Sequence, residues 1–214
     1  MKHNRVLIVY TGGTIGMVQD ENGSLHPFAL DRIYDAVPQL RACSYDIDSV
    51  TLPNIIDSSC MTPTLWVEIA EIIEKHYDSY DGFVVLHGTD TMAYTASALS
   101  FMFKNLSKPI VFTGSQLPLG MLRSDGRENI ICALEIASTR LVTIPEVCIF
   151  FESHLYRGNR STKINAENLT PSSRTTIPRW PRLASTSALR STSLCRCPQC
   201  RCRCERSSTL VWLY

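Results

Sequence analysis

Apolar residues between positions 5 and 150 alternate between two patterns. Short runs rich in β-branched residues are separated by longer segments whose apolar positions recur at helical spacing. The short runs predict strands at Val6–Tyr10, near Ser49–Leu52, and at Gly82–His87, Ile110–Thr113 and Val147–Phe151. This alternation predicts an α/β fold, in which helices cover both faces of a parallel sheet.

Three segments between these runs predict helices. The first has Thr62 as its N-cap and Pro63 as its first helical residue, and it ends near Tyr77. The others extend from about Thr91 to Phe103 and from about Gly126 to Ala137. The apolar residues expected to face the sheet are Leu65, Ile69, Ile72 and Ile73 on the first helix, and Met92, Ala96, Leu99 and Phe103 on the second.

The pattern stops after residue 167, which predicts a domain over residues 1–168 and a disordered tail over 169–214. The tail is rich in Ser, Thr, Arg and Cys and lacks apolar periodicity before Leu210–Tyr214. From residue 168 onward there are eight arginines and one acid, giving +7, so residues 1–167 carry −6. We interpret the abrupt change as a reading-frame shift just after Asn168. Gene sequencing tests this, and one intact frame with independent support for the tail would contradict it.

The composition argues against a membrane or a nucleic acid as a partner of this chain. With 44% apolar and 19% charged residues, the chain can bury a core. The run Val6–Tyr10 is too short for a signal peptide, and no run approaches the roughly 20 apolar residues of a membrane helix. We therefore expect a cytoplasmic protein without membrane contact. The tail arginines predict only non-specific attraction to nucleic acid, so no nucleic-acid partner is expected.

The cysteines do not predict a metal site. Those of the body, Cys43, Cys60, Cys132 and Cys148, have neither metal nor disulfide spacing. The tail cysteines between residues 195 and 204 follow the pattern C-x-C-x-x-C-x-C-x-C, which lacks the paired C-x-x-C geometry of a structural zinc site.

Polar turns follow three of the predicted strands: Thr11–Gly16, His87–Thr91 and Thr113–Gln116. Because parallel strands deliver their carboxyl ends to one edge of the sheet, these turns should crowd one pocket. Glycines at positions 12, 13 and 16 do not match the G-x-G-x-x-G spacing of a dinucleotide site, and the polar residues 20–23 follow where a helix would be required.

A glycine pair that lifts a hydroxyl clear of its neighbours suits a nucleophile. A threonine hydroxyl needs a base, and Lys163, buried against Asp90, would accept a proton through Thr89. Structural alternatives stay open for each: Thr14 would complete a turn, Asp90 would cap the helix at Thr91, and Lys163 would be a solvated charge. His87 is predicted to be a hydrogen-bonded structural histidine.

Four motifs together resemble the bacterial cytoplasmic, type I, L-asparaginases over residues 5 to about 168. They are Tyr10–Gly16, Asp57–Ser59, His87–Met92 and Tyr156–Lys163. Each is short, but all four stand in the order and spacing of the family, which makes the resemblance specific. It implies the N-terminal domain of that family, a Rossmann- or flavodoxin-like sheet, here incomplete and without the smaller C-terminal domain.

The resemblance also implies roles for individual residues. Thr14 would be the nucleophile that forms an acyl-enzyme, and Thr89, Asp90 and Lys163 would handle protons. Backbone N–H groups around Thr14 and Thr89 would stabilise the oxyanion, and no cofactor or metal is implied. The residues expected to bind L-asparagine, through its α-carboxylate and α-ammonium groups among others, are Asp57, Ser58, Ser59, Thr89 and Asp90.

The chain departs from the family in two places. The stretch Gly23–Pro27 lacks the tyrosine that usually stands near Ser24, so the lid contact is not expected. Family members continue through a C-terminal domain that completes the neighbouring chain's site in a dimer, and usually a tetramer, which this chain is not expected to match. Three functions therefore stay open: an L-asparagine amidohydrolase (EC 3.5.1.1), an inactive fragment, or a glutamine-type amidotransferase subunit.

Overall fold

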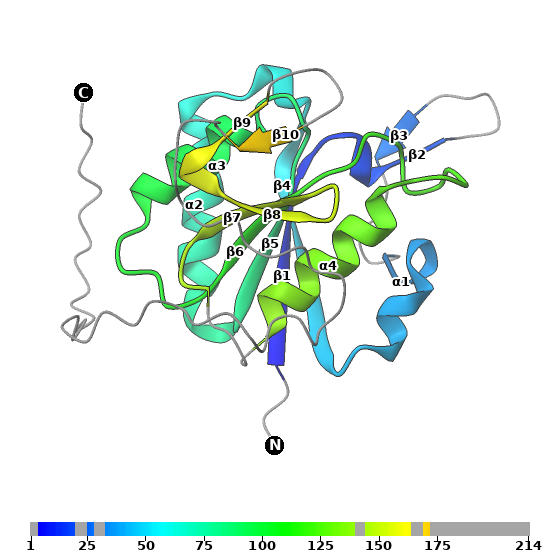
Figure 1. The fold of residues 1–214 in the computed structure, drawn as a ribbon, viewed down its shortest axis with the longest axis horizontal. Helices are drawn as coiled ribbons and strands as arrows, with labels where there is room; N and C mark the ends of the chain where they lie inside the picture. The colour runs from blue at the N-terminus through cyan, green and yellow to red at the C-terminus, as the bar shows by residue number, and fades with distance from the viewer. Residues whose placement is uncertain (1–3, 20–24, 28–32, 140–143, 164–168, 172–214) are drawn as a thin grey trace.

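The computed structural model describes residues 4–19, 25–27, 33–139, 144–163 and 169–171 of the 214-residue chain. Within these residues, the main sheet has the strand order β4-β1-β5-β6-β7-β8 (Figure 1). Neighbours are parallel except β7 and β8, which are antiparallel. The strands are β1 (Asn4–Gly12), β4 (Tyr45–Ile56), β5 (Gly82–Leu86), β6 (Ile110–Thr113), β7 (Val147–Phe151) and β8 (His154–Arg157).

Strand β8 makes the sheet mixed, where the sequence predicted a parallel one. The chain reverses at Glu152 and Ser153, which have φ of 48° and 59°. Two-residue hairpin turns with positive φ are usually marked by Asn or Gly, so Glu-Ser carries no turn signal. Leu155 and Tyr156 are buried, but a strand of four residues is too short for its alternation to stand out.

Helices cover both faces of the sheet, as predicted (Figure 1). On one face, Ile69, Ile73 and Leu99 pack with Leu7 and Val85. On the other, Ile130, Leu134 and Ile33 pack with Val6 and Leu86. Period-two alternation along β1 and β5 thus supplies both cores. The helices are α1 (Ile33–Ala36), α2 (Pro63–His76), α3 (Met92–Met102) and α4 (Gly126–Ser138).

The predicted helix boundaries agree with the structure to within one residue. Thr62 is the N-cap of α2 with Pro63 following, as expected, although the Thr62 side chain makes no capping hydrogen bond. Leu65, Ile72 and Phe103 are only half-buried, whereas the other residues predicted to face the sheet are buried.

Shorter elements connect this framework. Two antiparallel pairs join β2 (Met17–Gln19) to β3 (Leu25–Pro27) and β9 (Ser161–Lys163) to β10 (Leu169–Pro171). The 3-10 turns are η1 (Thr14–Gly16), η3 (Pro38–Ala42), η4 (Ser58–Cys60), η5 (Tyr77–Ser79) and η6 (Gly158–Arg160).

The end of the chain is described only in part. Strand β10 follows residue 168, where the sequence predicted no packed element, because three residues carry no detectable period. The predicted frame shift, the tail cysteines and Ser24 of the lid stretch lie outside the described residues. In the part of the chain that the structure describes, no helix has the length and apolar composition to cross a membrane.

Candidate active site

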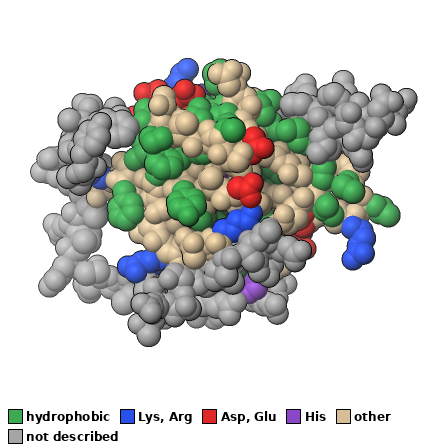
Figure 2. Space-filling model, turned by 90° about the horizontal axis from the view of Figure 1, so that it is seen from above, with side chains coloured by type: hydrophobic (Ala, Val, Ile, Leu, Met, Phe, Trp, Pro, Cys, Tyr) green, Lys and Arg blue, Asp and Glu red, His purple; other side chains and the backbone are tan. Residues whose placement is uncertain are grey.

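The three polar turns meet at the carboxyl ends of the parallel strands. A Cβ atom added to Gly13 would lie 2.5 Å from the nitrogen of Gly88, and one added to Gly88 would lie 2.3 Å from Ser58 Oγ. Gly114 is equally close, since its Cβ would lie 2.4 Å from the carbonyl oxygen of His87. The predicted gathering of these turns is confirmed. Figure 2 looks down on this edge, where acidic and basic side chains lie among uncharged ones.

Thr14 begins the turn η1, directly after the two glycines. Its predecessor Gly13 has φ of 86°, a left-handed conformation that favours glycine. The Thr14 side chain is half-buried, and no described residue forms a hydrogen bond with its hydroxyl. The carbonyl oxygen of Thr14 accepts from the Met17 N–H within the turn, and the role of its hydroxyl as a nucleophile stays a prediction.

Lys163 lies between Thr89 and Asp90 although more than seventy residues separate them in sequence. Its Nζ donates to Thr89 Oγ1 at 3.2 Å and to Asp90 Oδ1 at 2.7 Å. The Lys163 side chain is 16% exposed, so it is not a solvated surface charge. The structure thus brings together the three residues predicted to handle protons, whereas no described hydrogen bond links Thr14 to them.

Asp90 differs from its prediction in one respect. Its side chain is 62% exposed, so of the two members of this ion pair only Lys163 is largely buried. The carboxylate lies in the turn between β5 and α3, at the open edge of the sheet. Asp90 is not the N-cap of α3, because that position belongs to Thr91. A helix starting one residue later than predicted leaves the carboxylate available to Lys163.

The loop after β4 presents two serines beside this triad. Asp57 is the N-cap of η4, and its Oδ1 accepts from the backbone nitrogen of Ser59 at 2.9 Å. The hydrogen bonds from Ser59 lower the pKa of Asp57 below its usual value. Ser58 is buried against Gly88, whereas Ser59 is exposed. Asp57 therefore shapes the turn that carries both serines, and its direct contact with a substrate stays a prediction.

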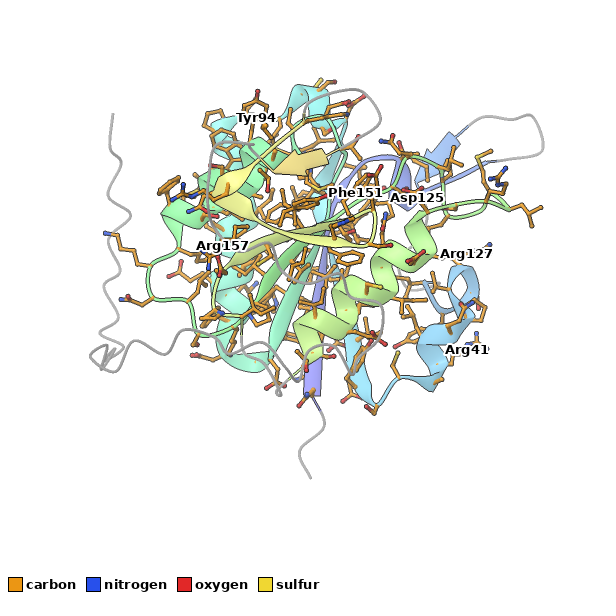
Figure 3. All side chains as sticks on the ribbon, in the orientation of Figure 1. Arg41, Tyr94, Asp125, Arg127, Phe151 and Arg157 are labelled. Atoms are coloured by element: carbon orange, nitrogen blue, oxygen red, sulfur yellow. The ribbon has the colours of Figure 1, made fainter. Side chains whose placement is uncertain are left out.

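Asp125 holds the third turn in place, a role that the sequence analysis missed. Its carboxylate accepts from the backbone nitrogens of Gln116 and Leu117 at 3.0 to 3.1 Å. Asn129, one helical turn later, donates to the carbonyl of Gly114 at 2.9 Å. Figure 3 labels Asp125 at the start of α4, where it is the N-cap residue. Its signal in the sequence was the i, i+4 spacing of two polar residues at a helix start.

His87 is a buried, hydrogen-bonded histidine, as predicted. Its Nδ1 lies 2.7 Å from the carbonyl oxygen of Gly88, and its ring packs beside Phe112 at a centroid distance of 5.9 Å. Nδ1 must be the protonated nitrogen, because a carbonyl only accepts. Burial lowers the pKa of His87 to about 4. A neutral imidazole thus lies directly beneath the turn that carries Thr89.

The buried His87 predicts a stability that depends on pH. The unfolded chain takes up a proton near the ordinary histidine pKa of 6.5, while the folded chain resists it down to about 4. Stability is therefore complete above pH 6.5 and falls as the pH is lowered toward 4. Relative to His87→Asn, we expect the native chain to lose about 3 kcal/mol more between pH 7 and pH 4. Urea unfolding measures this, and parallel profiles would contradict it.

Comparison with known proteins identifies the family of the chain. The family model described as "Asparaginase, N-terminal" matches residues 5–187. The chain belongs to the asparaginase family. It is 50% identical to L-asparaginase 1 of Escherichia coli over 78% of this chain, and 44% identical to a 60 kDa lysophospholipase of Mus musculus over 86%. The crystal structure of L-asparaginase I from Vibrio cholerae superposes with a TM-score of 0.73 at 45% identity, covering 83% of this chain.

The match covers only part of these relatives. The chain spans 49% of the Escherichia coli protein, 36% of the mouse protein and 53% of the Vibrio cholerae chain. The fold is that of the asparaginase N-terminal α/β domain, with a sheet of mostly parallel strands flanked by helices. All four motifs of the sequence analysis lie within the matched residues.

Proposed function

We propose that this chain carries the amide-hydrolysing site of an asparaginase and that its substrate is L-asparagine. The observation that carries the proposal is Lys163, whose Nζ lies 3.2 Å from Thr89 Oγ1 and 2.7 Å from Asp90 Oδ1. The turn holding Thr89 and Asp90 packs against Gly13, next to Thr14. A hydroxyl, a lysine and an orienting carboxylate form the arrangement that activates a threonine nucleophile. The choice of L-asparagine as substrate follows from the relatives named L-asparaginase.

In the first half of the reaction, Thr14 Oγ attacks the side-chain amide carbon of L-asparagine. Its proton passes through the Thr89 hydroxyl to the amine of Lys163. The carbonyl oxygen becomes an oxyanion, which backbone N–H groups around Thr14 and Thr89 stabilise. The C–N bond then breaks as the leaving nitrogen takes that proton back from Lys163 and departs as ammonia, and an ester remains on Thr14.

In the second half, water attacks the ester carbon and loses its proton by the same route. The bond to Thr14 Oγ breaks, the hydroxyl regains its proton, and L-aspartate leaves. Each cycle consumes one water and needs no oxidant or cofactor. The fixed positions of Thr89, Asp90 and Lys163 support this mechanism, because holding reacting groups in a fixed orientation accounts for much of an enzyme's rate enhancement.

Asp90, Ser58 and Ser59 have the charge and position to bind the α-ammonium and α-carboxylate groups of the substrate. The Asp90 carboxylate is 62% exposed, so one face can meet an α-ammonium group while Oδ1 keeps Lys163. The serine hydroxyls of the loop after β4 are donors suited to an α-carboxylate. Ser58 would contribute from a buried position and Ser59 from an exposed one.

We further propose a cytoplasmic location, as for the type I enzymes that the motifs resemble. In that family a C-terminal domain of the neighbouring chain completes each site of a dimer. This chain spans about half the length of these L-asparaginase relatives. The assay below therefore measures whether the chain alone hydrolyses L-asparagine.

The test measures ammonia release from L-asparagine by the purified 214-residue chain, with L-glutamine in parallel. We expect release from L-asparagine, and we expect Thr14→Ala to lower it by more than about 10³-fold because the nucleophile is lost. Thr14→Ala also measures contaminating host enzyme. A folded, soluble chain with no release would favour the inactive fragment. Preference for L-glutamine would favour the amidotransferase alternative.

A further inference from the structure

Thr91 stands at the N-cap of α3, yet its hydroxyl does not cap the helix. An N-cap threonine ordinarily accepts a hydrogen bond from a backbone N–H of the first turn, and here no such bond forms. Instead Thr91 Oγ1 donates to the carbonyl oxygen of Ser58 at 2.7 Å. The hydroxyl therefore joins the turn after β5 to the loop after β4. A local preference that goes unused beside a site is a signal of function.

The Ser58 carbonyl that Thr91 contacts, in the loop after β4, accepts two hydrogen bonds. It also accepts from the backbone nitrogen of Met61 at 3.2 Å, the bond that closes η4. The side chain of the same residue, Ser58, packs on Gly88. Asp57 fixes the start of the turn through Ser59 at 2.9 Å. Thr91 supplies the one described side-chain hydrogen bond that ties this loop to the Thr89–Asp90 turn.

We propose that Thr91 is a positioning residue, which sets the distance between the substrate-binding serines and the Thr89–Asp90–Lys163 group. This inference rests on the proposed function, in which one substrate molecule contacts both sides. Without the Thr91 bond, Ser58 and Ser59 would move relative to Asp90, and a substrate would have to order the loop on binding. Thr91 itself need not touch the substrate.

The first experiment compares Thr91→Val with Thr91→Ser. Valine keeps the shape of threonine and removes the hydroxyl. We expect KM for L-asparagine to rise about 3- to 10-fold, the equivalent of one neutral hydrogen bond. We expect kcat to change less than about twofold, because the loop holds substrate and transition state alike. Thr91→Ser keeps the donor and should restore KM.

Thr95→Val is the matched control. Thr95 lies one turn further along α3, is buried, and accepts from Trp66 Nε1 at 3.1 Å, with no described side-chain hydrogen bond to the loop. Its substitution should lower thermal stability and leave KM unchanged. If Thr91→Val behaves like Thr95→Val, or if Thr91→Ser fails to restore KM, Thr91 is merely structural and the proposal is overturned.

Amide hydrogen exchange tests the coupling without turnover. Loss of the Thr91 bond should speed exchange at the Met61 N–H several-fold, since both bonds share the carbonyl of Ser58. Thr91→Ser and Thr95→Val should leave that exchange unchanged. Unchanged exchange in Thr91→Val would contradict the positioning role. A native chain that shows this exchange pattern but releases no ammonia would contradict the proposed function instead.

Discussion

The Lys163→Met variant is expected to lose about 10²- to 10⁴-fold in kcat, the range typical for removal of a positioned acid–base group. Methionine keeps an unbranched side chain of similar length, so the packing of a residue that is 16% exposed is largely retained. What disappears is the amine that lies within hydrogen-bonding distance of Thr89 Oγ1. Steady-state and single-turnover ammonia release would measure the loss.

Arg160→Met serves as the control for charge alone. Arg160 is exposed on η6 and lies three residues before Lys163, so its substitution removes a positive charge near the same segment. We expect its kcat to stay within about twofold of the native value, since salt screens the charge of an exposed side chain. Lys163→Met that kept more than a tenth of the native kcat would show that Lys163 only orders Asp90.

The Gly12→Ala variant is expected to lose about 1–3 kcal/mol of unfolding free energy, the range typical of a residue held in a sparsely populated φ/ψ region. Gly12 ends β1 with φ of 132°, just after a shift in register against β4. A Cβ there would lie 2.0 Å from the carbonyl oxygen of Ile56, which is backbone and cannot rotate away. Urea unfolding at neutral pH would measure the change.

Gly126→Ala gives the contrast needed to interpret that loss. Gly126 is the first residue of α4, where alanine favours the helix, and its Cβ would meet side-chain atoms at 3.1 to 3.2 Å. We expect a change within about 1 kcal/mol. If both variants lost the same free energy, the close approach of β1 to Ile56 would not be the cause. Because Gly12 and Ile56 precede Thr14 and Ser58, Gly12→Ala should also lower activity.

Much of the framework was predictable because its information is local. Buried strands such as Ile110–Thr113 and Val147–Phe151 stand out as continuous apolar runs, and the structure has them at the same residues. Helices were predicted to within one residue because several turns of period 3.6 repeat the same signal. The short strands β8 and β10 were missed because neither repeats a period often enough, and the reversal before β8 uses Glu152 and Ser153.

The candidate site was predictable to the level of the sheet edge. Parallel topology alone places Thr14, Thr89 and the turn at Gly114 at the same end of the sheet, and Lys163 was expected beside them because it follows the fifth predicted strand. The exposure of Asp90 and the cap at Thr91 were not predictable, because the first turn of a helix can begin at either residue without changing the apolar pattern.

By itself, then, the sequence determined the α/β order, the two apolar faces and the family, since each depends on residue types at short, repeated spacings. Only the tertiary structure decided that Lys163 reaches both Thr89 and Asp90, that Asp125 holds the neighbouring turn, and that Thr91 contacts Ser58. These contacts join loops from different strands. Their distances follow from how the sheet stacks its strands and where each turn leaves it, which no local pattern records.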